Sequence, residues 1–204
     1  MEKSKNRMES SNLSDIFPRT KIYDPTANKM VLLKSLWEDN DKPLLLIYWL
    51  RRFGCQICKI TSSELSESLV KSNAEMENAL THVAIGLDEL DYDDFQAGNY
   101  FKDGKIFIDD NRSTYKALNF VKKGIFSLYG ILNPNIFIKA YEAGKKGMVS
   151  TFSGDGTQLG GTLIIDKQGN VIYKHIQKSY TDLPPIDDIV NNVKKYVQDN
   201  YIII

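Results

Sequence analysis

A continuous apolar run at residues 43–50 (PLLLIYWL) limits the folds open to this chain more than any other stretch. A half-buried strand would alternate apolar and polar residues, whereas a short run of this kind is typical of a central strand covered on both faces. The run leads into RRFGCQIC, residues 51–58, which contains both cysteines of the chain. Apolar residues then recur at helical spacing, at Ile57, Leu65 and Leu69. The sequence therefore predicts a cysteine pair where a buried strand passes into a helix.

The elements expected after this helix predict an α/β domain. Residues 161–165 and 171–176 read as strands separated by only five residues, a turn too short for a parallel crossover, so antiparallel pairing is expected. The order is strand, cysteine pair, helix, strand, helix, β-hairpin and closing helix. This is the order of a thioredoxin-like fold, with a central mixed sheet flanked by helices. The other expected elements are strands at 81–87 and 105–108 and helices at 113–118, 134 to about 144, and from 186 onward.

The chain of 204 residues is expected to form one domain, because it has no internal repeat and no Pro- or Gly-rich linker. We assign residues 21–204 to this domain. Residues 88–157 are interpreted as an insertion between the second strand and the final β-hairpin. Residues 1–20 are expected to be a disordered tail, since the first dozen are polar.

Charge and hydropathy exclude several classes of protein. Basic and acidic residues both total 26, and a general nucleic-acid binder would have a basic excess, so no nucleic-acid partner is expected. No stretch reaches the ~18 apolar residues that span a bilayer. The first twenty residues match neither a secretory signal nor an acid-poor mitochondrial presequence. We therefore expect a cytoplasmic protein, where two close cysteines are more commonly catalytic or metal-binding than a structural disulfide.

A position at a helix start favours a reactive thiol at Cys55. Unpaired backbone N–H groups and the helix dipole stabilise a nearby thiolate, which is the reactive form. Cys55 is expected to be the exposed nucleophile and Cys58, one turn further on, the more buried resolving thiol. Arg51 or Arg52 would lower the pKa of Cys55 further. Side chains of adjacent strand residues point to opposite faces, so at most one arginine faces the sulfur, and the other interpretation for that residue is a solvated strand end.

A metal site and two inert core cysteines are the alternatives to a redox pair. A structural zinc ion usually takes four cysteine or histidine ligands, and this chain offers only Cys55, Cys58, His82 and His175. Both histidines fall in expected strands. No GxGxxG or Walker-type loop follows a strand, so no tightly bound cofactor is expected, and no serine-elbow motif supports a hydrolase. A CxxC at a strand-to-helix junction favours the redox interpretation.

Several separate motifs resemble the prostamide/prostaglandin F synthase family, a peroxiredoxin-like group of the thioredoxin-fold superfamily. RRFGCQIC is similar to its active-site motif. The resemblance runs from about Tyr23 to the final helix, in a matching order. The other similar segments are GNYF at 98–101, KIFID at 105–109, YKAL at 115–118, SGDGTQLGG at 153–161 and HIQKS at 175–179.

This resemblance implies a thioredoxin-like fold and reduction of the O–O bond of prostaglandin or prostamide endoperoxides. Electrons would come from NADPH through thioredoxin as the donor, so NADPH need not bind this chain. The Cys55 thiolate would attack one peroxide oxygen, and Cys58 would then form the disulfide with Cys55. The supporting or substrate-site residues would be Arg51, Arg52, Gly54, Gly160 and Gly161.

Two departures from the wider superfamily qualify this expectation. Thioredoxins place a cis-proline before the hairpin strand, where this chain has Gly160-Gly161, which disfavours gripping of extended protein substrates. We interpret the glycines either as an open backbone beside the sulfurs or as a tight turn. The Pro and Thr that precede the reactive cysteine of peroxiredoxins are also missing.

Two other functions remain open. One is a general protein thiol–disulfide oxidoreductase, and the other is a non-catalytic thioredoxin-fold binding module. A lipid peroxide would need an apolar groove near Cys55. Residues 121–157 are expected either to supply that groove or to be ordinary core.

Overall fold

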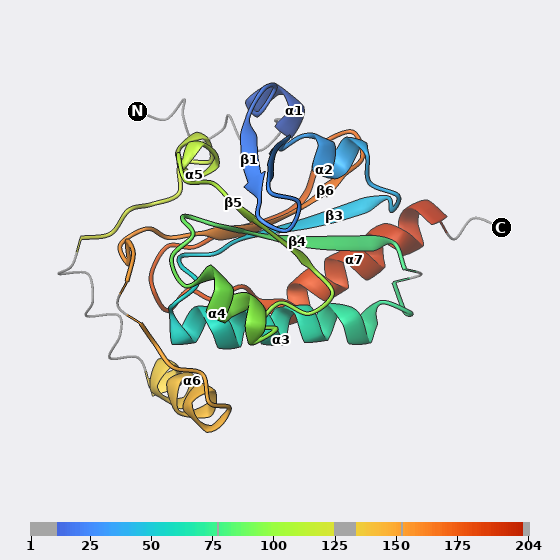
Figure 1. Ribbon diagram of the computed structural model, residues 1–204. Coiled ribbons are helices and arrows are strands. Elements are labelled where there is room, and N and C mark those ends of the chain that lie inside the picture. The colour runs from blue at the N-terminus through green and yellow to red at the C-terminus, as the bar shows by residue number, and fades with distance from the viewer. Residues whose placement is uncertain (1–11, 77, 125–133, 152, 202–204) are drawn as a thin grey trace, which may run out of the picture.

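The computed structural model describes residues 12–76, 78–124, 134–151 and 153–201 (Figure 1). A seven-stranded mixed sheet runs through this part of the chain in the order β2-β1-β5-β4-β3-β6-β7. The strands are β1 (Lys21–Asp24), β2 (Lys29–Leu32), β3 (Leu44–Trp49), β4 (Leu80–Gly86), β5 (Lys105–Ile108), β6 (Gly161–Asp166) and β7 (Val171–Ile176). The helices are α1 (Leu13–Ile16), α2 (Ser35–Glu38), α3 (Gln56–Ser72), α4 (Tyr92–Ala97), α5 (Ser113–Ala117), α6 (Pro134–Lys145) and α7 (Ile186–Tyr201).

Strand β3 lies inside the sheet and is buried along its whole length, as its apolar run predicts. It pairs parallel with β4 and antiparallel with β6. Alternate side chains enter two separate cores, because successive strand residues point to opposite faces. Leu46 and Tyr48 pack with residues of α3 and α7, whereas Ile47 and Trp49 pack on the face covered by α2 and α5. Figure 1 shows α3, α4 and α7 on one side of the sheet and α1, α2 and α5 on the other.

The C-terminal strands form the predicted antiparallel hairpin, with Thr162 opposite His175 and Ile164 opposite Tyr173. The insertion adds its own strand to the sheet, since β5 pairs parallel with β4. Strand β1 then pairs with β5 at Tyr23 and Ile108. Residues 88–157 are therefore part of the sheet architecture, and they also carry α6, which projects below α3 in Figure 1.

The packed chain begins before residue 21, where the sequence places the domain boundary. Leu13 and Phe17 are both buried against the core that contains Trp37. The Asn12 side chain accepts a hydrogen bond from Ser14 N and caps α1. The tail predicted for residues 1–20 therefore needs correction at residues 12–20, and residues 1–11 lie outside the described residues. Three apolar residues, Leu13, Ile16 and Phe17, among polar neighbours gave too little periodicity to predict this docking.

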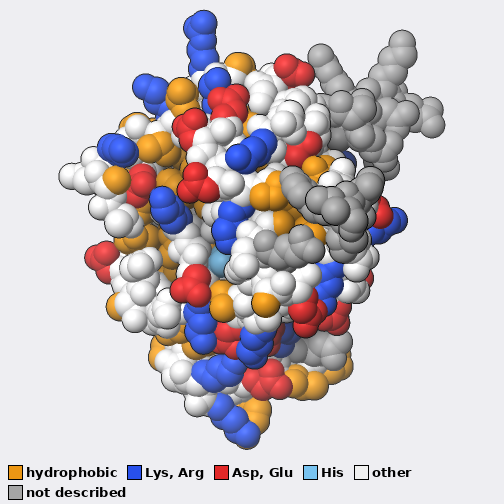
Figure 2. Space-filling view, turned by 90° about the vertical axis from the view of Figure 1, so that its right-hand side faces the viewer, with side chains coloured by type: hydrophobic (Ala, Val, Ile, Leu, Met, Phe, Trp, Pro, Cys, Tyr) orange, Lys and Arg blue, Asp and Glu red, His pale blue; other side chains and the backbone are white. Residues whose placement is uncertain are grey.

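One face of the protein carries charges of both signs. Figure 2 shows basic and acidic side chains interspersed over one face, as the balanced composition leads one to expect. None of the helices in the described ranges is long and apolar enough to cross a membrane.

Candidate active site

The two cysteines lie at the junction between β3 and α3, as predicted. Cys55 is the N-cap of α3 and has an extended backbone, with φ −78° and ψ 119°. Its carbonyl accepts the first helical hydrogen bond, from Lys59 N at 2.9 Å. Cys58 lies in the first turn of the same helix. The Cys55 sulfur is therefore held where unpaired N–H groups and the helix dipole favour an anion.

Both thiols are free, and Cys55 is more buried than expected, while Cys58 is buried as predicted. Cys55 is 8% exposed and Cys58 is 3% exposed, so Cys55 is the more accessible of the two but not an exposed side chain. The insertion contributes to this cover, because Thr151 N donates a hydrogen bond to the carbonyl of Gly54, directly before Cys55. Burial of the pair limits its access to bulk solvent.

Arg51 is the arginine that faces the sulfur. Its Nη2 lies 3.2 Å from Cys55 Sγ, within hydrogen-bonding distance. Arg52 turns the other way, and its Nη1 donates to the carbonyl of Ser153 at 3.0 Å. Both residues follow the end of β3, so neither is a solvated strand end, and their side chains serve different partners.

The environment sets the two thiols apart in acidity. A hydrogen bond from the Cys58 thiol lowers the pKa of Cys55 well below its ordinary value, and the positive charge of Arg51 adds to this effect against the cost of burial. The same hydrogen bond, together with burial, raises the pKa of Cys58 well above its ordinary value. Both shifts favour Cys55 as the thiolate and Cys58 as the proton-bearing thiol, and the roles of nucleophile and resolving thiol stay predictions.

The ring of Tyr180 lies against the guanidinium of Arg51. The guanidinium carbon of Arg51 lies 5.3 Å from the centre of the Tyr180 ring, a cation–π geometry. Tyr180 is itself buried, and its hydroxyl donates to the carbonyl of Lys123 at 3.3 Å. Sequence reasoning missed Tyr180, because no spacing or motif connects it to the cysteine pair.

The three glycines assigned to the site are required by close packing. A Cβ on Gly54 would meet the side chains of Thr151 and Asp91, and one on Gly160 would meet the carbonyl of Trp49. A Cβ on Gly161 would lie 2.7 Å from the carbonyl of His175. None of the three has a positive φ. The space beside Gly160 and Gly161 is thus filled by neighbouring strands, which differs from both the open backbone and the tight turn expected from the sequence.

Residues from the insertion bind the first turn of α3. The Gln56 side chain, between the two cysteines, donates to the carbonyls of Ala140 and Met148 at 3.0 and 2.8 Å. One turn later the buried Lys59 ammonium donates to the carbonyl of Val149 at 2.9 Å and forms an ion pair with Asp94. The sequence signal for the ion pair of Lys59 with Asp94 is a lysine inside a helical apolar pattern, and it was not recognised as one.

The histidines considered as zinc ligands have other partners. His82 Nε2 lies 2.7 Å from the carbonyl of Lys102, so it donates there, and burial lowers the pKa of this histidine. His175 Nε2 lies 3.2 Å from Asp182. Over the described ranges, the structure gathers no group of three or more His, Cys, Asp or Glu side chains that could hold a metal ion. The zinc alternative therefore gains no support.

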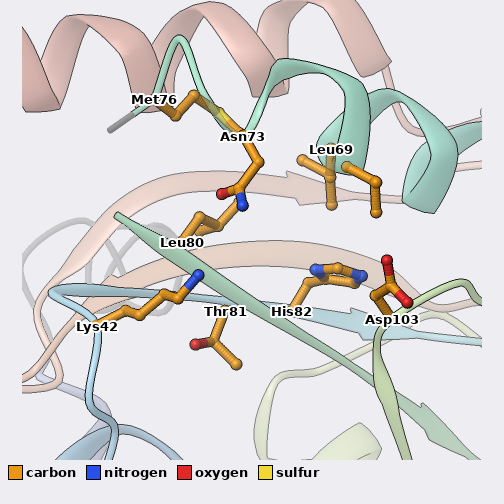
Figure 3. Close-up of a pocket in the computed structure, with 9 residues that line it drawn as sticks. Lys42, Leu69, Asn73, Met76, Leu80, Thr81, His82 and Asp103 are labelled. Atoms are coloured by element: carbon orange, nitrogen blue, oxygen red, sulfur yellow. The ribbon is translucent and has the colours of Figure 1, made fainter. Parts of the chain in front are cut away.

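A cavity of about 250 Å³ lies far from the cysteines, at the opposite end of the sheet. Figure 3 shows Leu80, Thr81 and His82 lining it from the first residues of β4, with Lys42 and Asp103 at its sides. The cysteines follow the last residue of β3, and β3 and β4 run parallel, so the cavity does not adjoin them. The apolar groove expected from residues 121–157 lies partly outside the described residues, at 125–133 and 152.

Residues 49–179 match the family model described as AhpC/TSA antioxidant enzyme, a span that includes the cysteine pair, Gly160 and Gly161. The match covers more than half of the chain, so the protein belongs to this peroxiredoxin-like family of oxidoreductases. The family has a thioredoxin-like fold, which confirms the fold class predicted from the order of elements.

Relatives named prostamide/prostaglandin F synthase are similar over most of the chain. The one from Danio rerio is 33% identical over 184 residues, covering 89% of this chain and 88% of its own length. The one from Xenopus tropicalis is 34% identical over 174 residues, with 84% and 83% covered. The human one is 30% identical over 162 residues, with 78% of each chain covered. These relatives confirm the family resemblance.

Solved structures of peroxiredoxins share the fold at low identity. Peroxiredoxin Q of Xanthomonas campestris has a TM-score of 0.59 at 12% identity, covering 93% of this chain and 98% of its own. PrxQ of Xylella fastidiosa has a TM-score of 0.61 at 12% identity, with 92% and 96% covered. The shared fold therefore extends over nearly the whole length of this chain and of the two peroxiredoxins.

Proposed function

We propose that this protein reduces peroxides, and lipid endoperoxides in particular, through Cys55 and Cys58. The observation that carries the proposal is the geometry around Cys55. Its sulfur sits at the helix start, 3.2 Å from the Arg51 guanidinium, with a protonated thiol one turn away. That arrangement supplies a nucleophile, a positive charge for the developing oxyanion and a resolving group.

In the first step, the Cys55 thiolate attacks one oxygen of the O–O bond. The S–O bond forms as the O–O bond breaks, and the bonding pair leaves on the second oxygen. That oxygen becomes an alkoxide and takes a proton from water, while Arg51 stabilises its charge. With a cyclic endoperoxide, both oxygens remain on the substrate, one of them bonded to Cys55.

In the second step, Cys58 attacks the Cys55 sulfur. The Cys55–Cys58 disulfide forms, and the S–O bond breaks to release the first oxygen as an alcohol, which takes the Cys58 proton. One peroxide and two thiols thus give two hydroxyl groups and one disulfide, a two-electron reduction of the substrate. A raised pKa keeps the Cys58 proton available for this step.

Thioredoxin would restore the dithiol, and NADPH would supply its electrons through thioredoxin reductase. This donor is proposed from the family resemblance. It requires a reducing compartment, which fits the predicted cytoplasmic location. The names of the curated relatives favour a prostaglandin or prostamide endoperoxide as substrate.

Reduction of protein disulfides is the second candidate function, because any CxxC pair can exchange with a disulfide. The backbone at Gly160 argues against it. Gly160 N donates to the Gln177 side chain at 2.9 Å, so this N–H group is already used and does not face an incoming peptide. A small peroxide needs no such backbone pairing.

The test follows NADPH oxidation in the presence of thioredoxin and its reductase. Four oxidants are offered separately: a prostaglandin endoperoxide, hydrogen peroxide, an alkyl hydroperoxide and a disulfide-bonded protein. We expect turnover with one or more peroxides, none in Cys55→Ser, and in Cys58→Ser a single round without recycling. Turnover on the protein disulfide alone favours the second function, and turnover on nothing favours a binding module. Undiminished activity of Cys55→Ser overturns the assignment of the nucleophile.

A further inference from the structure

Helix α6 exposes an apolar face that the described part of the chain leaves uncovered. Phe137 is 56%, Ile138 55% and Tyr141 65% exposed. These three residues fall within roughly 100° of arc when a helix turns by about 100° per residue, so they form one stripe. Val149, just after the helix, is exposed as well.

The opposite face of α6 fixes the helix to the body of the protein. Ala143 of α6 and Met148, just after the helix, pack against Ile60 of α3. Ile136 of α6 is buried as well. The Lys139 ammonium forms an ion pair with Glu64, also on α3. The carbonyl of Ala140 accepts the hydrogen bond from Gln56. The helix therefore already has a buried side, and the apolar stripe is a second side that faces outward.

Lysines border this apolar stripe. Lys145 places its ammonium 4.5 Å from the centre of the Tyr141 ring, and Lys146 is exposed next to it. Residues 121–149 contain five lysines and a single acidic residue, Glu142. Lys122 and Lys139 form ion pairs with Asp155 and Glu64, and Lys145 and Lys146 lie at the edge of the stripe. An apolar face with aromatic residues and lysines at its edge is typical of helices that lie in the interface of a membrane.

We infer that the outer face of α6 is a docking surface for membranes with anionic lipid headgroups. The apolar stripe would enter the headgroup region, and Lys145 and Lys146 would pair with phosphate or carboxylate groups. The binding would be peripheral and reversible, because a single short helix face supplies the contact.

A membrane fits this face better than a second copy of the chain. The stripe exposes on the order of a few hundred Å² of apolar surface, whereas a stable protein interface needs about 800 Å² from each partner. Two copies meeting through α6 would also bring Lys145 and Lys146 of each copy close to those of the other. An anionic bilayer attracts the lysines, and peripheral binding to it does not require a contact area of that size.

The first experiment is co-sedimentation of the full chain with vesicles of phosphatidylcholine alone or of phosphatidylcholine with phosphatidylserine. We expect binding to the anionic vesicles, weaker binding in high salt and little binding to phosphatidylcholine alone. The combined change Phe137→Ser with Ile138→Ser should reduce binding tenfold or more, and Lys145→Gln with Lys146→Gln several-fold. Met30→Ser with Lys29→Gln, an exposed apolar–basic pair on β2, is the matched control and should bind as the unmodified chain does.

A second experiment does not depend on weakening the helix. Phe137→Trp places a fluorophore on the stripe, while Trp37 and Trp49 are fully buried and give a constant background. We expect a blue shift on adding anionic vesicles. Three results would overturn the inference. The first is neither a fluorescence shift nor sedimentation with vesicles, and the second is vesicle binding that the Phe137→Ser, Ile138→Ser variant retains. The third is a dimer in solution that dissociates in the same variant. Sedimentation and fluorescence both measure vesicle binding, so a negative result in either does not bear on the proposed thiol chemistry. A negative result in the NADPH oxidation assay likewise does not bear on vesicle binding.

Discussion

The guanidinium Nη2 of Arg51 lies 3.2 Å from the sulfur of Cys55, while the neighbouring Arg52 binds the carbonyl of Ser153. This division decides which positive charge acts on the nucleophile. It also identifies a matched pair of variants, because the two arginines are adjacent in the chain and differ in what they contact.

We expect Arg51→Met to raise the pKa of Cys55, because the change removes the cation beside the thiolate. Alkylation by iodoacetamide at neutral pH should slow by about tenfold, the effect of a loss of ~1.4 kcal/mol. The measurement is alkylation rate against pH in a Cys58→Ser background. The rate falls as pH drops through the pKa of Cys55, and in Arg51→Met this fall should begin at a higher pH. Arg52→Met should move the profile less, and an equal shift in both variants contradicts the assignment.

Tyr180→Leu is expected to act on Cys55 indirectly, by releasing Arg51 from the ring that holds it. The pH profile of alkylation should shift in the same direction as in Arg51→Met, by a smaller amount, since a cation–π contact contributes about 0.5–2 kcal/mol. Tyr180→Phe keeps the ring and loses only the bond to the Lys123 carbonyl, so its profile should stay close to that of the unmodified protein. A profile that Tyr180→Leu leaves unchanged would show that Arg51 is positioned without the ring.

Cys58→Ala is expected to raise the pKa of Cys55, because the hydrogen bond from the Cys58 thiol is the largest cause of its depression. Cys58→Ser keeps a hydroxyl that can donate the same bond, so its effect should be smaller. Both variants lack the Cys58 thiol, so a difference between them reports on the pKa of Cys55 and not on the loss of turnover. The measurement is again alkylation rate against pH, and identical profiles for alanine and serine would argue that the bond to Cys58 does not control the thiolate.

Asp94→Asn is expected to destabilise the fold more than Lys59→Met. Lys59 is buried, so removing its partner leaves an uncompensated cation, whereas methionine removes the charge and keeps most of the volume. We expect Asp94→Asn to cost about 1–2 kcal/mol, a reduced value because the Asp94 side chain is largely exposed. Urea unfolding measures both variants. Asp93→Asn, an acid in the same first turn of α4, serves as the control for the helix dipole and should cost less.

The fold was largely predictable because its signals are local. The apolar run of β3, the CxxC after it and the five-residue turn of the final hairpin each specify an element from adjacent residues. The strand at 105–108 was predicted, but its place in the sheet was not, because its pairing with β4 and β1 joins residues that are distant in the chain. The docking of Leu13 and Phe17 was missed for the same reason, since their partners are distant in the chain.

The candidate site was predictable in its cysteines and not in its surroundings. Local spacing placed Cys55 at the helix start. The direction of Arg51 depends on how the chain bends after β3, and its contact with Tyr180 depends on the whole C-terminal half of the fold. The glycines at 160 and 161 were recognised, but their reason, close approach to the Trp49 and His175 backbones, exists only in three dimensions.

The side chain of Gln56 has a consequence for any attempt to shorten this chain. A truncated version that kept every strand but lacked α6 and the loop after it would remove both carbonyls that this amide binds. The residue between the two cysteines would then have to find new acceptors or turn toward water, and the first helical turn would lose its lateral support. The segment that holds both cysteines is thus supported by residues that lie far downstream in the sequence, and a shortened chain that keeps the geometry of this helical turn has to include them.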